Sequence, residues 1–105
     1  MFRNGAEVVL NPASIPADRA ELWRALGLAR AAENTIFLAM ANNTATSYSD
    51  GRPVSGGSFV AWPYGNRLTD AGPAEGLHYF SLDLAEITRV RSRWPYLEDV
   101  RAAKP

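Results

Sequence analysis

The sequence predicts an α/β fold, in which a mixed sheet is covered by helices within a single domain spanning residues 1–105. Two observations support this prediction. Apolar runs bounded by turn residues alternate with helical periodicity, in the order strand, helix, strand, strand, strand, helix. Hydrophobic residues make up 47% of the chain and charged residues 21%, a balance typical of a globular protein with one small core.

Two apolar runs predict the first two strands. The run GAEVVLNPA (5–13) stops at Asn11-Pro12 and indicates an interior strand. The run TIFLAMAN (35–42) lacks polar–apolar alternation, which predicts a strand covered on both faces. Residues 43–55 are polar and rich in turn formers, so a loop is expected there.

The segment between these strands predicts a helix. Asp18 and Glu21 have capping-box spacing, and the helix can extend to about Asn34. The expected inward stripe, at steps of four, three and four, is Leu22, Leu26, Ala29 and Glu33. This spacing places the Glu33 carboxylate on the buried side.

The second half predicts two more strands and their connections. The run GGSFVAWP (56–63) indicates a strand, and PYGN (63–66) indicates a turn. The stretch TDAGPAEG (69–76) predicts a loop, and LHYFSL (77–82) predicts the last strand.

A second helix is expected after this strand. Asp83 and Glu86 have capping-box spacing, and the helix should stop before Pro95. Its expected buried positions are Ile87, Val90 and Trp94. Residues 96–105 carry weak signals and predict no particular element.

Composition excludes several classes of function. Lys+Arg and Asp+Glu both total 11, so no net charge attracts a polyanion, and no nucleic-acid partner is expected. The chain has no Cys and a single histidine, His78, so we expect no metal site and no cofactor. No apolar stretch reaches the ~20 residues that span a bilayer, and the N-terminus lacks a signal-peptide pattern. These features predict a cytoplasmic protein without a membrane partner.

Glu33 is the polar residue that most needs an explanation. A buried, unpaired carboxylate costs several kcal/mol, so Glu33 requires a partner. Arg30, three residues earlier, lies within helical side-chain reach. Two interpretations stay open: a structural Arg30–Glu33 ion pair at the helix-to-strand junction, or a general base. The first is favoured because ion-pair networks perturb carboxylates as readily as active sites do.

Three further features have structural explanations. SGGS (55–58) resembles a phosphate-binding loop but precedes a strand, so close backbone packing is expected instead. His78 lies in a predicted alternating strand and should be a hydrogen-bonded structural residue. Three arginines, Arg89, Arg91 and Arg93, do not share one helical face, and their place near a helix C-terminus explains them more simply than a basic patch.

Six motifs stand in order along the chain: GAEVVLNPA, the Trp23 helix running into RAAEN, GGS, PYGN, LDLAEITRVR, and the closing spacing of Arg91, Pro95 and Arg101. Together they resemble the C-terminal part of the nitrilase (carbon–nitrogen hydrolase) superfamily. The resemblance covers nearly the whole chain without large insertions. It implies that the chain forms half of an α-β-β-α sandwich, with Glu33 and Asn34 as scaffold residues.

The resemblance also implies a chemistry that this chain lacks. Nitrilase relatives hydrolyse nitriles or amides with a Glu–Lys–Cys triad, in which the thiolate attacks carbon, Glu shuttles protons and Lys stabilises charge. All three positions would lie upstream of Met1, so no catalytic residue is assigned here. By resemblance, Asn11, Pro12 and Ala13 form one wall of the substrate pocket. A turn-initiating role for Asn11 is an equal alternative.

Two function hypotheses from different classes follow. The first is the C-terminal part of an amidase- or nitrilase-type enzyme that hydrolyses non-peptide C–N bonds and is inactive alone. The second is a non-catalytic binding or assembly module. The expected partner is an N-terminal half-domain of a nitrilase-like protein or a second copy of the chain, because an uncovered sheet face with unpaired edges associates. A third hypothesis, an independent enzyme using Glu33 or Asp83, is weak because both have structural roles.

Overall fold

The computed structural model describes residues 5–44, 47–54 and 56–103, and it confirms the α/β class. One mixed sheet contains four strands in the order β1-β2-β3-β4. Strand β1 runs parallel to β2, and the other two pairs are antiparallel. The elements are β1 (Val8–Ala13), α1 (Ala20–Asn34), β2 (Phe37–Asn42), β3 (Ser58–Ala61), β4 (Leu68–Gly72), α2 (Ala85–Arg93) and α3 (Tyr96–Ala102).

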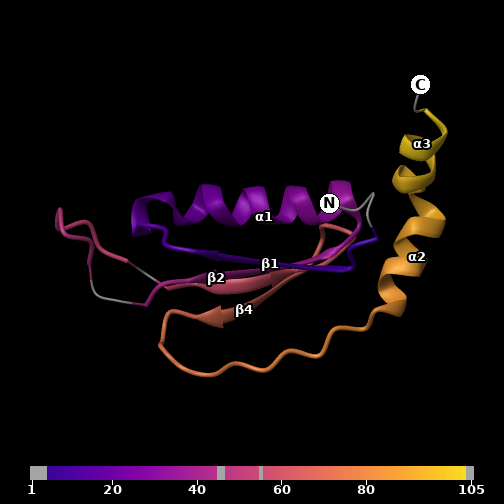
Figure 1. Ribbon diagram of the computed structural model, residues 1–105. Helices are drawn as coiled ribbons and strands as arrows, with labels where there is room; N and C mark the ends of the chain where they lie inside the picture. Colours follow the sequence, from indigo (N-terminus) through magenta and orange to yellow (C-terminus); the bar gives the residue numbers. More distant parts are fainter. Residues whose placement is uncertain (1–4, 45–46, 55, 104–105) are drawn as a thin grey trace.

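The sheet lies between one long helix and a returning segment of chain. Figure 1 shows α1 along one face of the sheet, while the chain after β4 crosses the other face to reach α2 and α3. Both short helices lie at the end where α1 finishes. This helix-on-sheet arrangement is half of the predicted sandwich.

Strand β2 forms the centre of the core, as its unbroken apolarity predicts. Leu38 and Met40 pack with Trp23, Phe59 and neighbouring residues under α1. On the opposite face, Phe37 packs with Val60 and Ile87, supported by Trp62, Phe80 and Leu82. Both faces of β2 are therefore covered, because each side of the sheet buries its own apolar cluster.

Helix α1 begins differently from the capping-box prediction. A 3₁₀ turn (Ala17–Arg19) precedes it, and neither start has a side-chain cap. The Arg19 N–H donates to the Pro16 carbonyl at 3.0 Å, and the Ala20 N–H donates to Ala17. The Asp18–Glu21 capping box is wrong because these backbone bonds already satisfy amide groups that a cap would serve.

The inward face of α1 is also displaced from the predicted stripe. Trp23, Gly27 and Ala31 are buried, whereas Leu22 and Leu26 are 46% and 43% exposed. Ala29 and Glu33 are exposed as well. The packing reason is the close approach at Gly27, where a Cβ atom would lie 2.6 Å from the Phe59 ring. The row that contains a glycine lets the helix axis come nearest to the sheet.

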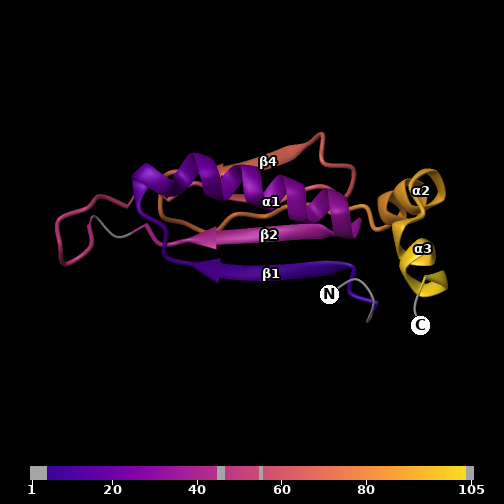
Figure 2. The same cartoon turned by 90° about the horizontal axis from the view of Figure 1, so that it is seen from above.

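Strand β1 is an edge strand and not the interior strand that was predicted. Among the described residues it pairs with β2 alone, and Leu10 is 74% exposed. Figure 2 shows β1 along the outer side of the sheet. Val9 and Ala13 pack against the core, but the described residues leave the apolar Leu10 side chain uncovered.

The prediction of a last strand at residues 77–82 is wrong. A strand, β4, forms instead mostly within the segment that was predicted to be the loop before it. A tight turn, with the Trp62 N–H donating to the Arg67 carbonyl at 3.0 Å, brings β4 against β3. Residues 77–82 lie outside any strand and cross the second face. Their Phe80 and Leu82 side chains pack on the core, while Leu77 and Tyr79 are 79% and 85% exposed.

Helix α2 ends where the sequence predicts, with Trp94 as its C-cap before Pro95. Ile87 and Val90 are buried as expected, but Trp94 is 42% exposed. The capping box is again incorrect in detail, because Asp83 Oδ1 accepts from the Ala85 N–H at 3.1 Å while Glu86 pairs with Arg89. The weakly specified residues that follow form α3.

Candidate functional site

The carboxyl ends of the two parallel strands meet at one edge of the sheet. Ala13, the last residue of β1, is in register with Asn42, the last residue of β2. In open α/β sheets, ligands bind beyond the carboxyl ends of such strands. This edge is therefore the candidate site, and loops on both sides of it determine its shape.

The Asn42 side chain holds this edge together. Its Oδ1 atom accepts hydrogen bonds from the backbone N–H groups of Ile15 at 2.7 Å and Asn43 at 2.9 Å. Its Nδ2 atom donates to the carbonyls of Ile15 at 3.1 Å and Gly56 at 2.7 Å. The carboxamide thus uses two donors and two acceptors, its full capacity. It fixes the loop after β1 and the loop before β3 to the end of β2.

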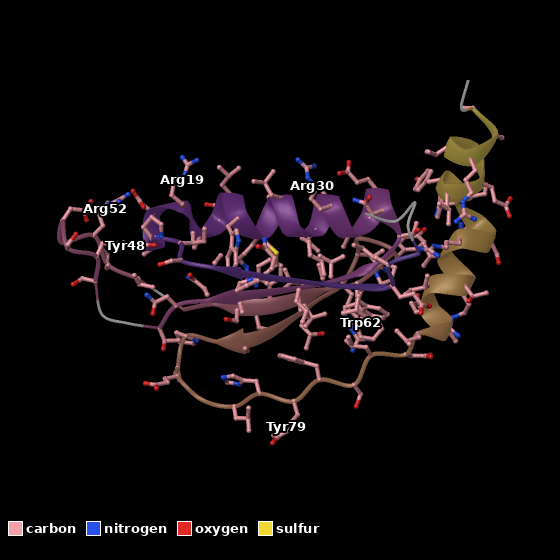
Figure 3. The ribbon with its side chains drawn as sticks, in the orientation of Figure 1. Arg19, Arg30, Tyr48, Arg52, Trp62 and Tyr79 are labelled. Carbon is pink, nitrogen blue, oxygen red and sulfur yellow. The ribbon has the colours of Figure 1, made fainter. Side chains whose placement is uncertain are left out.

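Backbone and hydroxyl groups extend this network. The Asn42 N–H donates to Ser58 Oγ at 2.8 Å. In the loop after β1, Ser14 Oγ and the Tyr48 hydroxyl lie 3.0 Å apart. Figure 3 shows Tyr48 at the far end of the molecule from α2 and α3, together with Arg52. The Arg52 guanidinium carbon lies 5.2 Å from the Tyr48 ring centroid.

A cavity of about 330 Å³ adjoins Asn42. The polar residues that line it include Thr44, Ser58, Glu75 and His78. Glu75 and His78 come from the segment after β4 and are exposed. These groups can donate hydrogen bonds to a carboxylate or an amide oxygen and accept them from an amide N–H, but they include no thiol. The edge is thus suited to hold a polar substrate group, and it contains no cysteine nucleophile.

The predicted wall residues lie on β1 and do not all line the same groove. Asn11 and Pro12 are exposed, and Ala13 is half-buried. Asn11 Nδ2 donates to Met40 Sδ at 3.3 Å, and Asn11 lines a separate groove of about 420 Å³ between β1 and α1. Pro12 and Ala13 do not line that groove. The substrate-wall role of these three residues stays a prediction.

The Arg30 and Glu33 side chains are in contact, with Nη1 3.0 Å from Oε1. However, they are 52% and 56% exposed, so the predicted burial of Glu33 is wrong. Figure 3 shows Arg30 pointing away from the sheet. Asn34 Nδ2 donates to the Arg30 carbonyl at 2.8 Å and caps the end of the helix. The buried setting that suggested a general base is absent.

His78 and Asn42 show what the sequence could and could not indicate. His78 was expected in a strand, but it lies in an extended loop beside the cavity. Asn42 was not singled out, although an amide that ends an apolar strand needs partners for its polar atoms. That signal could have identified it.

Within residues 5–44, 47–54 and 56–103, no group of three or more His, Cys, Asp or Glu residues could hold a metal ion. None of the helices in these ranges is long and apolar enough to cross a membrane.

Residues 1–92 match the family described as carbon–nitrogen hydrolase. The chain belongs to the carbon–nitrogen hydrolase family. A 2-oxoglutaramate amidase of Bacillus subtilis is 34% identical over 97 residues, which is 92% of this chain and 37% of that protein. An (R)-stereoselective amidase of a Pseudomonas species is 35% identical, over 92% of this chain and 35% of that protein. This carbon–nitrogen hydrolase chain therefore spans a little over a third of the length of these curated relatives.

Solved structures agree with this membership. A carbon–nitrogen hydrolase from Helicobacter pylori superposes with a TM-score of 0.83 at 25% identity, over 94% of this chain and 39% of that one. An amidase of the nitrilase superfamily from Nesterenkonia gives a TM-score of 0.72 at 35% identity, over 96% of this chain and 34% of that one. The carbon–nitrogen hydrolase fold is thus matched over nearly all of the present chain.

Proposed function

We propose that this chain supplies the C-terminal part of an amidase- or nitrilase-type carbon–nitrogen hydrolase and does not hydrolyse C–N bonds alone. One comparison carries the proposal. A mutant of the Nesterenkonia amidase, 35% identical to this chain, shows covalent addition of the acetamide moiety of fluoroacetamide at the active-site cysteine. The present 105 residues contain no Cys, so they offer no atom for that adduct.

In this proposal the chain contributes the walls of a site and a partner contributes the reactive groups. The partner is an N-terminal half-domain that bears the Glu, Lys and Cys of the family triad. Its thiolate attacks the substrate carbon, and the Asn42 network holds the adjacent loops in place. The exposed edge of β1, with Val8 at 38% and Leu10 at 74% exposure, offers a surface on which such a partner packs.

The test is complementation of activity. The purified chain is assayed for ammonia release from amides, nitriles and N-carbamoyl compounds, alone and with the N-terminal half of a close amidase relative. We expect no hydrolysis by the chain alone and measurable hydrolysis by the mixture. The matched control is the same N-terminal half with its nucleophilic cysteine replaced by alanine, which should bind without restoring activity.

Two results would contradict this proposal. Ammonia release by the chain alone that is abolished by Glu33→Ala, with the fold intact, would show a different catalytic machinery. Binding of the N-terminal half without hydrolysis would favour the second function, a non-catalytic assembly module. The exposure of Leu10, Leu77 and Tyr79 is the observation that supports that module.

A further inference from the structure

A larger cavity is lined by residues from the end of α1, the turn after β3, the end of α2 and α3. Figure 1 shows that these helix ends lie at the opposite end of the sheet from the carboxyl end of β2. The volume of the cavity is about 560 Å³, within the range of small-molecule sites. Three aromatic rings and one carboxylate contribute to its lining: Tyr64, Trp94, Tyr96 and Glu33. We call these four side chains the aromatic cage. The carboxyl-edge site and the proposed hydrolase function use none of them.

A backbone turn between α2 and α3 brings two of the rings together. Pro95 has φ −81° and ψ 52°, and the Tyr96 N–H donates to the Trp94 carbonyl at 2.8 Å. These are the features of an inverse γ-turn. The turn stacks the Trp94 and Tyr96 rings with centroids 6.4 Å apart and planes at 21°.

The third ring comes from the turn between β3 and β4. Next to Tyr64, the Gly65 N–H donates to the Trp62 carbonyl at 3.0 Å. Gly65 is pressed against α1, where an added Cβ would lie 2.6 Å from Ala32 Cβ. The Tyr64, Trp94 and Tyr96 side chains remain 40%, 42% and 40% exposed, so the core does not use their full surface.

Charge at the cage favours a cation. Glu33 lies in the last turn of α1, where the helix dipole places partial negative charge, and no basic residue lies in that turn. The faces of aromatic rings carry negative potential as well. The Glu33 carboxylate, the C-terminal end of α1 and the ring faces therefore each contribute negative potential at the cage.

The arginines near the cage neutralise only part of this negative potential. Arg30 pairs with Glu33, but both side chains are more than half exposed, so the pair is weak and screened by salt. The Arg93 guanidinium carbon lies 6.0 Å from the Trp94 ring centroid, at the limit of a cation–π contact. Arg91 donates its Nε hydrogen bond to Thr35 Oγ1 at 3.0 Å, while its buried Nη2 has no hydrogen-bond partner among the described residues.

We propose that the aromatic cage binds an alkylated ammonium group, of the kind carried by choline. The remaining lining is mostly apolar, including Ala29, Ala32, Val90 and Val100. Among the described residues, Glu33 is the one carboxylate in the lining, so few acceptors serve a cation that needs several hydrogen bonds. A trimethylammonium group needs none, and its methyl groups pack on the rings and the aliphatic wall.

The test is an NMR titration of the full chain with choline, at a protein concentration where light scattering shows no self-association, read at the tryptophan indole N–H signals. The chain has three Trp residues, of which Trp23 is buried in the core and Trp62 Nε1 bonds to Thr69. We expect a saturable shift of the Trp94 signal, assigned by its loss in Trp94→Phe, with the other two unchanged. The neutral isostere 3,3-dimethylbutan-1-ol should shift it far less, because it has the same shape without the charge.

Charge variants give the sign of the interaction. Glu33→Gln should weaken choline binding at least about threefold, whereas Glu98→Gln, an exposed acid outside the cage lining, should not change it. Arg93→Ala should strengthen binding, because it removes a competing cation from Trp94. A titration in which no indole signal moves, equal binding of both isosteres, or unchanged affinity in Glu33→Gln would each overturn the proposal.

Discussion

Among single residues, Asn42 bonds extensively through its side chain at the candidate site. Its four side-chain hydrogen bonds join β2 to the loops on either side. Asn42→Ala should lower the free energy of unfolding by about 2–3 kcal/mol, because it leaves several backbone groups without partners. Denaturant melts of the folded chain measure the loss. Asn11→Ala removes only one bond to a sulfur atom and should cost far less, so equal losses would contradict this account.

The exposed Arg30–Glu33 ion pair should contribute little to the free energy of unfolding. Burial would have made the loss of one partner expensive, but both side chains are more than half exposed. A double-mutant cycle with Arg30→Ala and Glu33→Ala should give a coupling free energy below about 0.5 kcal/mol. A coupling of several kcal/mol would show that something covers the pair.

At the scale of elements, α1 packs on the sheet through its glycine. Gly27→Ala gains helix propensity of about 1 kcal/mol but places a methyl group 2.6 Å from the buried Phe59 ring. Phe59 is itself held edge-on against Trp23, with ring centroids 5.1 Å apart. The net result should be a loss of about 1–2 kcal/mol, measured by denaturant melts. Ala25→Gly on the exposed face calibrates the propensity, and a stabilised Gly27→Ala would contradict the close contact.

The start of α2 should depend on pH through Asp83. A side-chain hydrogen bond from Arg89, followed by the Ala85 N–H bond, lowers the pKa of Asp83 below its usual 3.8. Because the pKa of Asp83 is lower in the folded chain than in the unfolded chain, the ionised carboxylate stabilises the helix at any pH above the unfolded-state pKa. This stabilisation is lost as the pH falls through the folded-state pKa. The Ala85 amide resonance should therefore shift at acidic pH below 3.8. Asp83→Asn should abolish that pH dependence.

The elements also show which features can be predicted from sequence. Strand β2 and the end of α2 were predictable, because an unbroken apolar run and a proline act locally. The inward row of α1 was not predictable. The row of residues 22, 26 and 29 and the neighbouring row of residues 23, 27 and 31 are both apolar, and which of them faces the sheet depends on Phe59 across the core. The same limit applies to 77–82, whose pattern is strand-like but which forms no ladder with the described chain. The Asn42 network joins three distant segments, so sequence alone could suggest only that its amide needs partners.

For the whole molecule, the layers explain why a partner is expected. The principal extents are 49, 31 and 20 Å, and the smallest corresponds to about two layers of secondary structure. An α-β-β-α sandwich needs four. One sheet face is covered by α1, and the described residues that cover the other from outside the sheet include Phe80, Leu82 and Ile87 of α2. Leu10, Leu77 and Tyr79 remain exposed beyond this cover, and Figure 3 shows Tyr79 pointing away from the sheet.

This arrangement predicts how the isolated chain behaves in solution. Exposed apolar side chains beside the unpaired edge of β1 should make it self-associate or remain loosely folded. Light scattering should report association, and amide hydrogen exchange should be fast in β1 and slower in β2, whose two faces are covered. Adding an N-terminal half of a carbon–nitrogen hydrolase should disperse the aggregates and protect β1. A compact monomer with β1 already protected, and no response to that partner, would show that these residues close their own core.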